Sequence, residues 1–223
     1  MRKRELSDGV FCREGRVYLW YLIAWLVTLL LFLLCEAFID PNICHEIWSP
    51  LDDVIPFSEG FVVFYVLWYF MIIGSIVWLG LYRRESFRSF LLFMTACQLL
   101  GMLIFLLYPN KQLLRPEIMP RDNAFADLVL LIHSVDTNTN VCPSMHVAYS
   151  VAMSSVWSKE RSVPLSARGV IAFLCLMVCL STVFIKQHSV IDGVVALIIC
   201  IPVELVIYRG FWKELFTKTG ENK

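Results

Sequence analysis

Residues 17–35 read VYLWYLIAWLVTLLLFLLC, nineteen positions without a charged side chain. A helix rises about 1.5 Å per residue, so a run of this length crosses the hydrocarbon core of a bilayer, about 30 Å thick. Four further runs are long and predominantly apolar: 61–82, 90–108, 169–185 and 190–208, of which the last contains Asp192 and Glu204. A cleaved signal peptide is the alternative for the first run, but Glu36 follows it directly and no small-residue cleavage site is present. We therefore expect an all-α, polytopic membrane protein.

Residues 144–157 form a sixth, shorter and more polar run, in which Ser150, Ser154 and Ser155 alternate with alanines. Small side chains let helices approach closely in lipid, so we expect this helix inside the bundle. Apolar residues make up 58% of the chain and charged ones 17%, against about 25% in soluble domains. This composition leaves no stretch for a separate soluble domain. We expect one domain over residues 1–223, a bundle of six transmembrane helices.

Lysine and arginine are distributed unevenly between these runs, although 19 basic and 19 acidic residues give zero net charge. Fifteen of the 19 lie in the N-terminal segment, the loops at 83–89 and 158–168, and the C-terminal tail. Basic segments stay in the cytoplasm, which places both termini there. The opposite side includes residues 36–60, with six acids and no base. The balanced charge gives no reason to expect a nucleic acid as partner.

The outer side holds all four histidines and the four remaining cations. They are His45, His133, His146 and His188, with Lys111, Arg115, Arg121 and Lys186. We expect His45, in an acidic loop, and His133, beside Asp136, to be solvated or structural. The eight cysteines do not form a disulfide pattern, and of them only Cys44 and Cys142 are placed to meet.

Several of these outer groups suit a phosphate. Arg115 offers a planar fork of donors, and Lys111 and Lys186 add point charges. Ser144 can cap the helix that follows it, and the free N–H groups of that helix would then face the same place. Together these residues predict an anion site.

His188 and Asp192 are four residues apart at the start of the last apolar run. In a helix this spacing lets the carboxylate hold one imidazole nitrogen and make the other a better nucleophile. Ser181, seven residues earlier, brings the end of the preceding helix beside His188. His146 can protonate a leaving alcohol. The set predicts phosphoryl transfer through a phosphohistidine, without a metal or other cofactor. Ser189 and Asp192 also form a capping box, and the two roles can coexist.

These motifs resemble the type 2 phosphatidic acid phosphatase superfamily of integral membrane lipid phosphatases and phosphotransferases. The family pattern is K-x6-R-P, then P-S-G-H, then S-R-x5-H-x3-D. This chain matches it at Arg115 and Pro116, at Pro143, Ser144 and His146, and at Ser181, His188 and Asp192. The resemblance implies six helices and an outward-facing active site. It also implies His188 as nucleophile, Asp192 as its partner, His146 as acid and base, and Arg115 and Ser144 as phosphate ligands.

Three positions depart from the family pattern. Lys111 precedes Arg115 by four residues rather than seven, Met145 replaces the glycine, and Thr182 replaces the second arginine. Lys186, one helical turn after Thr182, is the natural substitute for that arginine. Methionine in place of the glycine is similar to phosphorylceramide-type head-group transferases and to many short bacterial members. We therefore expect a lipid phosphate or diphosphate phosphatase in a bacterial plasma membrane.

Three other functions remain as alternatives. A head-group phosphotransferase would use the same histidines with an alcohol as acceptor. A transporter or proton relay needs ionisable groups at several depths, and only Glu204 lies deeper than the outer edge. A metal site built from His188, Asp192, His146 and His133 is opposed by the nearby cations. The expected partner is a lipid phosphate within the bilayer, with its tail and the oligomeric state left open.

Overall fold

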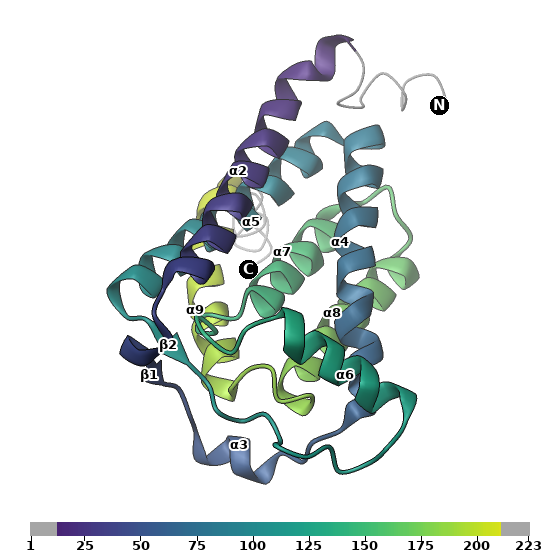
Figure 1. The fold of residues 1–223 in the computed structure, drawn as a ribbon. Coiled ribbons are helices and arrows are strands. Elements are labelled where there is room, and N and C mark those ends of the chain that lie inside the picture. The colour runs from purple at the N-terminus through teal and green to yellow at the C-terminus, as the bar shows by residue number, and fades with distance from the viewer. Residues whose placement is uncertain (1–12, 211–223) are drawn as a thin grey trace, which may run out of the picture.

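Helices account for most of residues 13–210, the part of the chain that this computed structural model describes (Figure 1). Five of them are long and apolar enough to cross a membrane: α2 (Leu19–Phe38), α4 (Val62–Tyr82), α5 (Arg84–Leu107), α8 (Leu165–Phe184) and α9 (Val190–Ile207). Each corresponds to one of the five long apolar runs, so the expected helical membrane protein is confirmed. Some of the basic residues counted above lie outside the described residues: Arg2, Lys3, Arg4, Lys213, Lys218 and Lys223.

Two of these helices begin earlier than expected. Helix α5 begins at Arg84 rather than at 90, because its first turn buries Phe87 while Glu85 and Arg88 face outward. Helix α8 begins at Leu165 rather than at 169, directly after Pro164, and proline is well tolerated at a helix start. Hydropathy alone therefore missed helical turns whose outward faces are polar.

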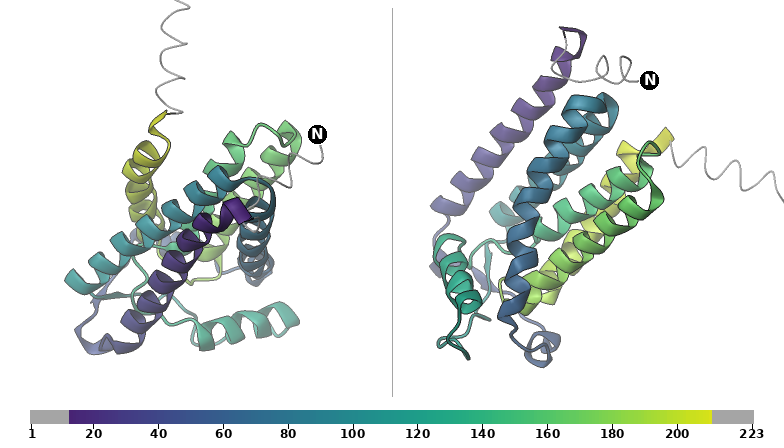
Figure 2. Two further views of the ribbon diagram at one scale, coloured as in Figure 1. Left: turned by 90° about the horizontal axis from the view of Figure 1, so that it is seen from above. Right: turned by 90° about the vertical axis from the view of Figure 1, so that its right-hand side faces the viewer.

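Helix α7 (Met145–Lys159) lies at the centre of the molecule (Figure 2). It packs against α4, α5, α8 and α9, and nine of its 15 residues are buried, including Ala148, Ser150 and Ala152. These small side chains let its neighbours approach closely, as we expected. The helix is shorter than the five above.

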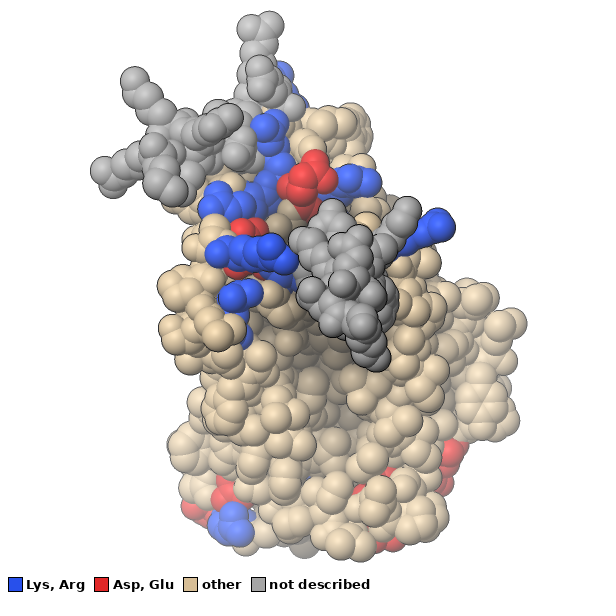
Figure 3. Space-filling view, turned by 180° about the vertical axis from the view of Figure 1, so that it is seen from behind, with Lys and Arg blue, Asp and Glu red and all other residues tan. Residues whose placement is uncertain are grey.

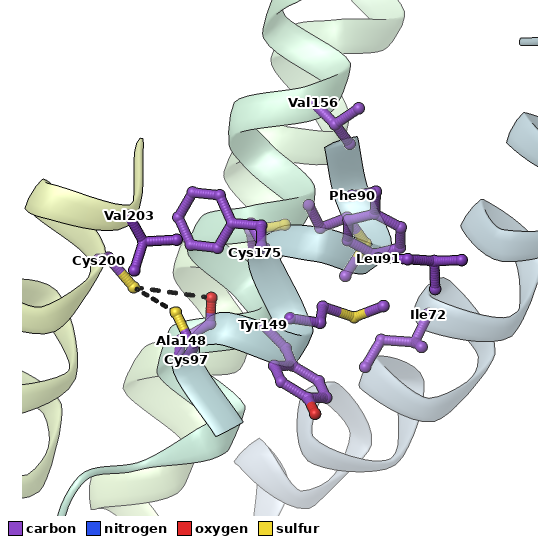
Figure 4. Packing of buried hydrophobic residues seen from close by; sticks show 14 of the residues in the cluster. Ile72, Phe90, Leu91, Cys97, Ala148, Tyr149, Val156, Cys175, Cys200 and Val203 are labelled. Atoms are coloured by element: carbon purple, nitrogen blue, oxygen red, sulfur yellow. Dashed lines mark hydrogen bonds between the residues drawn. The ribbon is translucent and has the colours of Figure 1, made fainter. Parts of the chain in front are cut away.

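The hydrophobic core surrounds α7 (Figure 4). Phe90 and Leu91 of α5 pack there with Tyr149 of α7 and with residues of α8 and α9. The Cys200 sulfur lies 3.9 Å from the Cys97 sulfur. Every cysteine that the structure describes is a free thiol, including Cys44 and Cys142; Cys12 lies outside the described residues.

Short elements gather at the end of the molecule where α8 turns into α9 (Figure 1). They are η2 (Pro41–Ile43), β1 (His45–Glu46), α3 (Pro50–Val54), η3 (Glu59–Phe61), β2 (Asn110–Lys111) and α6 (Ala124–Val135), whereas η1 (Arg13–Tyr18) precedes α2 at the other end. Strands β1 and β2 pair in parallel, with His45 opposite Asn110. These short elements, apart from η1, form an outer cap that covers the α8–α9 turn. The Ser58 N–H in this outer cap donates to the Phe184 carbonyl at 2.9 Å.

The charges divide between the two ends of the molecule. Most lysines and arginines gather near the start of α2 and the end of α4, with some acidic residues among them, and mainly acidic residues lie at the opposite end (Figure 3). A broad band of uncharged surface separates the two groups in this view. A bilayer requires such a band, because burying charges in hydrocarbon is costly.

Candidate functional site

His188 lies on the short turn between α8 and α9 and contacts Asp192 in the first turn of α9. The His188 Nδ1 atom is 3.1 Å from Asp192 Oδ2, and the same oxygen accepts the Ser189 N–H at 3.0 Å. Asp192 is fully buried. Its carboxylate favours a proton on Nδ1, which leaves a lone pair on Nε2. The capping box and the histidine contact are therefore present at once.

The N-terminus of α7 is held beside this pair. Ser144 caps α7 by accepting the Val147 N–H at 3.4 Å, and its own N–H donates to the Asp192 carbonyl at 3.1 Å. The second residue of α7, His146, has its ring centroid 5.7 Å from that of His188. The two histidines, which are 42 positions apart in the sequence, thus meet in the fold.

His146 is enclosed by aromatic rings of α4. Its ring centroid lies 4.2 Å from that of Trp68 and 4.3 Å from that of Tyr65. Its Nε2 atom is buried and has no hydrogen-bond partner among residues 13–210. A buried nitrogen without a hydrogen-bond partner lowers the stability of the folded protein by about 1–3 kcal/mol. This imidazole nitrogen is therefore free to form a hydrogen bond with a ligand.

A cavity of about 380 Å³ adjoins both histidines. Its walls come from α2, α4 and α7 and from Gln98 of α5, and residues of the segment 135–143 also line it. Most of the lining side chains are hydrophobic or aromatic, among them Trp25, Leu29, Phe32, Leu33, Trp68, Tyr69, Ile72, Ile73, Met145 and Tyr149. Among the described residues that line it, none is a lysine or an arginine. The site therefore offers an apolar chamber with two imidazoles at its polar end.

Arg115 lies next to this site but is bonded to the protein. Its guanidinium donates to the carbonyl oxygens of His133, Asp136 and Thr137 at 2.6–2.8 Å, and to Gln187 Oε1 at 3.1 Å. Burial lowers the pKa of Arg115, and the carboxylate of Asp136 opposes that shift. Arg115 thereby ties the end of α6 to the residue before His188.

The two lysines chosen as phosphate ligands also donate to carbonyl oxygens. Lys186 adopts a left-handed backbone conformation with φ of 58°, and its ammonium donates to the Asp52 and Ile55 carbonyls at 2.5 and 2.6 Å. Burial lowers its pKa. Lys111 donates to the Pro41 carbonyl at 3.1 Å. Backbone carbonyl oxygens thus hold both lysines, and an ammonium has three N–H donors in all.

Ser181 is enclosed within α8. It is fully buried, and its hydroxyl donates to the Val178 carbonyl of the same helix at 2.6 Å. The predicted phosphate-binding roles of Ser181, Lys111, Lys186 and Arg115 stay predictions, since each of these groups is bonded to a protein oxygen in this structure.

Sequence reasoning missed three buried polar residues that hold the site. Asp52 of α3 accepts the Ser189 hydroxyl at 2.6 Å and the Val190 N–H at 2.8 Å. Gln112 donates to the carbonyls of Lys186 and Gln187 at 3.1 and 3.3 Å. Asn110 accepts the Cys142 N–H at 2.8 Å and donates to its carbonyl at 2.9 Å. The capping box at Ser49 and Asp52 was the one signal in the sequence, and it does not reveal the contact with α9.

The remaining histidines contact the structure around the site. His133 lies 3.1 Å from the Ile185 carbonyl through Nε2, and burial lowers its pKa to about 4, with the charge of Arg115 acting in the same direction. His45 stacks on Tyr108 with ring centroids 4.4 Å apart. Within residues 13–210, no three histidine, cysteine or acidic side chains are grouped as metal ligands.

The chain matches no family model, no curated protein and no solved structure. The functional argument therefore rests on the geometry above and on the motifs themselves.

Proposed function

We propose that this protein is a membrane lipid phosphatase that acts on a lipid phosphate or diphosphate through a phosphohistidine. The observation that carries the proposal is the contact of His188 with the buried Asp192, beside His146 and at the end of an apolar cavity. An oriented imidazole is a nucleophile, a second imidazole is an acid and base, and the cavity suits an acyl or prenyl chain.

The reaction divides into two transfers. In the first, Nε2 of His188 forms a bond to phosphorus while the bond from phosphorus to the lipid oxygen breaks, and His146 gives that oxygen a proton. In the second, His146 takes a proton from water, whose oxygen displaces His188 from phosphorus and yields inorganic phosphate. Asp192 holds the His188 ring in one orientation and stabilises its positive charge in both steps.

Two groups are available for the phosphate oxygens. The first N–H groups of α7 have no partner within the helix, and its positive dipole end lies beside His188. The bond of Arg115 to Gln187 is its longest side-chain contact at 3.1 Å, and a phosphate oxygen is a stronger acceptor than an amide oxygen. We infer that phosphate binding exchanges this contact.

The proposed architecture includes α7 as a sixth span within one bundle. The division of charge supports a cytoplasmic location for both termini and an extracytoplasmic site, because basic segments stay inside. A bacterial plasma membrane fits this arrangement and the motifs.

His188→Ala in the detergent-solubilised full chain is expected to abolish phosphate release from a panel of lipid phosphates. His146→Gln is expected to lower kcat by about 10²–10⁴-fold, since it removes an acid and base. With a phosphate-labelled substrate, acid-labile label should appear on the wild-type chain and not on His188→Ala. The control is His45→Ala, which changes a histidine that stacks on Tyr108 away from the cavity. Unchanged turnover in His188→Ala contradicts the mechanism.

A head-group phosphotransferase is the second candidate. The cavity carries polar side chains beyond the histidines, including Glu36 and Asn140, and attack by water does not require them. The same labelled substrate separates the two activities, because hydrolysis sends the label to free phosphate and transfer sends it to a new lipid or sugar phosphate.

A further inference from the structure

Glu36 places a carboxylate in the wall of the cavity, in the last turn of α2. Within residues 13–210, the hydrogen bonds that reach this carboxylate come from Thr137. None of the described residues that line the cavity is a lysine or arginine. A carboxylate at the edge of a membrane span is costly unless a donor or a cation meets it. The protein supplies only part of that compensation.

Asn140 lines the same cavity and has unmade hydrogen bonds. The residue is 5% exposed, and its buried Nδ2 and Oδ1 atoms have no partner among the described residues. A buried amide group without a partner is costly. The backbone around it is fixed, because its N–H donates to the Asn110 carbonyl at 2.6 Å. An asparagine held in this way requires an explanation.

Some of the other polar groups in the cavity wall have partners within the protein. Gln98 accepts the Thr28 hydroxyl at 3.1 Å, and the Tyr149 hydroxyl accepts the Trp25 N–H at 3.1 Å. The indole N–H of Trp68, which also lines the cavity, has no partner among the described residues. The unmet capacity therefore lies in this N–H, the two histidines, Glu36 and Asn140.

Glu36 and Asn140 define the chemistry of a ligand group that binds between them. Glu36 only accepts hydrogen bonds, and Asn140 both donates and accepts. A phosphate would be repelled by the Glu36 carboxylate and would need cations that this wall lacks. A hydroxyl or an ammonium group donates to Glu36, and a hydroxyl also accepts from Asn140. A cavity of about 380 Å³ brings this position and His188 within reach of one ligand.

We propose that Glu36 and Asn140 form a subsite for a hydroxyl or ammonium group of the substrate, adjacent to the phosphate at His188. The proposal rests on the proposed function, because it takes the phosphate to lie at the histidines. It narrows the substrate class to lipid phosphates that carry a hydrogen-bond donor near the phosphate.

The test uses three single-chain lipid phosphates of equal length that differ on the carbon next to the phosphate-bearing carbon, which carries a hydroxyl, an amine or only hydrogen. The expected wild-type kcat/KM is about tenfold or more higher for a substrate with a donor, because a hydrogen bond to a charged group is worth about 1.5–3 kcal/mol. Glu36→Gln should remove the preference for the amine, since it removes the charge and keeps an acceptor for Thr137. Asn140→Gly, which suits the left-handed backbone at φ of 53°, should reduce the preference for the hydroxyl. Glu46→Gln, an exposed acid of β1, is the control and should leave all three values unchanged.

Equal wild-type kcat/KM values for the three lipids overturn the subsite, as do unchanged ratios in Glu36→Gln and Asn140→Gly. Release of phosphate from none of them overturns the proposed function instead. The subsite is then decided by the rise in Tm that each lipid causes. The subsite is supported if the lipid with a hydroxyl or amine raises Tm more than the third lipid does, and if Glu36→Gln or Asn140→Gly removes that difference. Equal rises in Tm overturn it.

Discussion

Asp52 is a buried carboxylate that joins the outer cap to the turn that carries His188. One of its oxygens accepts both the Ser49 N–H at 2.8 Å and the Ser189 hydroxyl at 2.6 Å. The other accepts the Val190 N–H at 2.8 Å. Ser189 also donates its N–H to Asp192, so two carboxylates hold the residue that follows His188. Asp52 thus holds the two residues that directly follow His188.

Asp52→Asn is expected to lower the free energy of unfolding by about 1–3 kcal/mol, because an amide cannot accept from every donor that now surrounds the carboxylate. The measurement is thermal or denaturant unfolding of the detergent-solubilised chain. Asp53→Asn is the matched control, since Asp53 is exposed and accepts only the Trp48 indole N–H at 3.1 Å among the described contacts. Equal destabilisation by the two substitutions would show that Asp52 has no special role.

At the scale of the helices, α7 meets α5 where Met145 faces Gly101. A Cβ atom at position 101 would lie 2.8 Å from the end of the Met145 side chain and 3.5 Å from Pro143. The methionine that stands where the resembling family has glycine is thus accommodated by a glycine on the neighbouring helix. This contact lies one residue from His146.

Gly101→Leu is expected to destabilise the protein by about 1–3 kcal/mol, because the added side chain overlaps Met145. Met145→Ala in the same chain should recover part of the loss, which a double-mutant cycle of unfolding free energies measures. Gly74→Leu is the control, since a Cβ atom there meets nothing within 4 Å. If the Met145→Ala substitution recovers nothing, the two residues are not coupled.

Helices were easier to predict from the sequence than contacts between distant segments. The five long apolar runs are helices, and alanine and serine placed α7 among its neighbours. The four-residue spacing of His188 and Asp192 predicted their contact, and His188 lies on the turn just before α9. The bonds from Asp52 to Ser189, and from Lys186 to carbonyls of α3, join segments more than 100 residues apart. No periodic pattern in the sequence predicts such pairs. The lysines and the arginine that we assigned to phosphate donate hydrogen bonds to backbone carbonyl oxygens instead.

On the scale of the whole molecule, the division of charge predicts the orientation in the membrane. Ile118, 85% exposed in the segment between β2 and α6, lies at the acidic end, and Ser166 lies near the basic loop before α8. A cysteine that replaces Ile118 should react with a membrane-impermeant thiol reagent in intact cells. A cysteine that replaces Ser166 should react only after permeabilisation, because basic loops stay inside.

The unmodified chain is the control for this labelling, since its described cysteines are native free thiols. Reaction of the Ser166→Cys chain in intact cells, with none for Ile118→Cys, would reverse the proposed orientation.

The central position of α7 also bears on how the protein is made. In the proposed topology α7 is the shortest of the six spans, with 15 residues, and its serines gain little from contact with lipid. We therefore expect α7 to insert into the bilayer only after α8 and α9 have been synthesised and can pack against it. Both imidazoles are carried by this late-inserting half, so the nascent chain acquires its reactive groups only in the final step of its assembly.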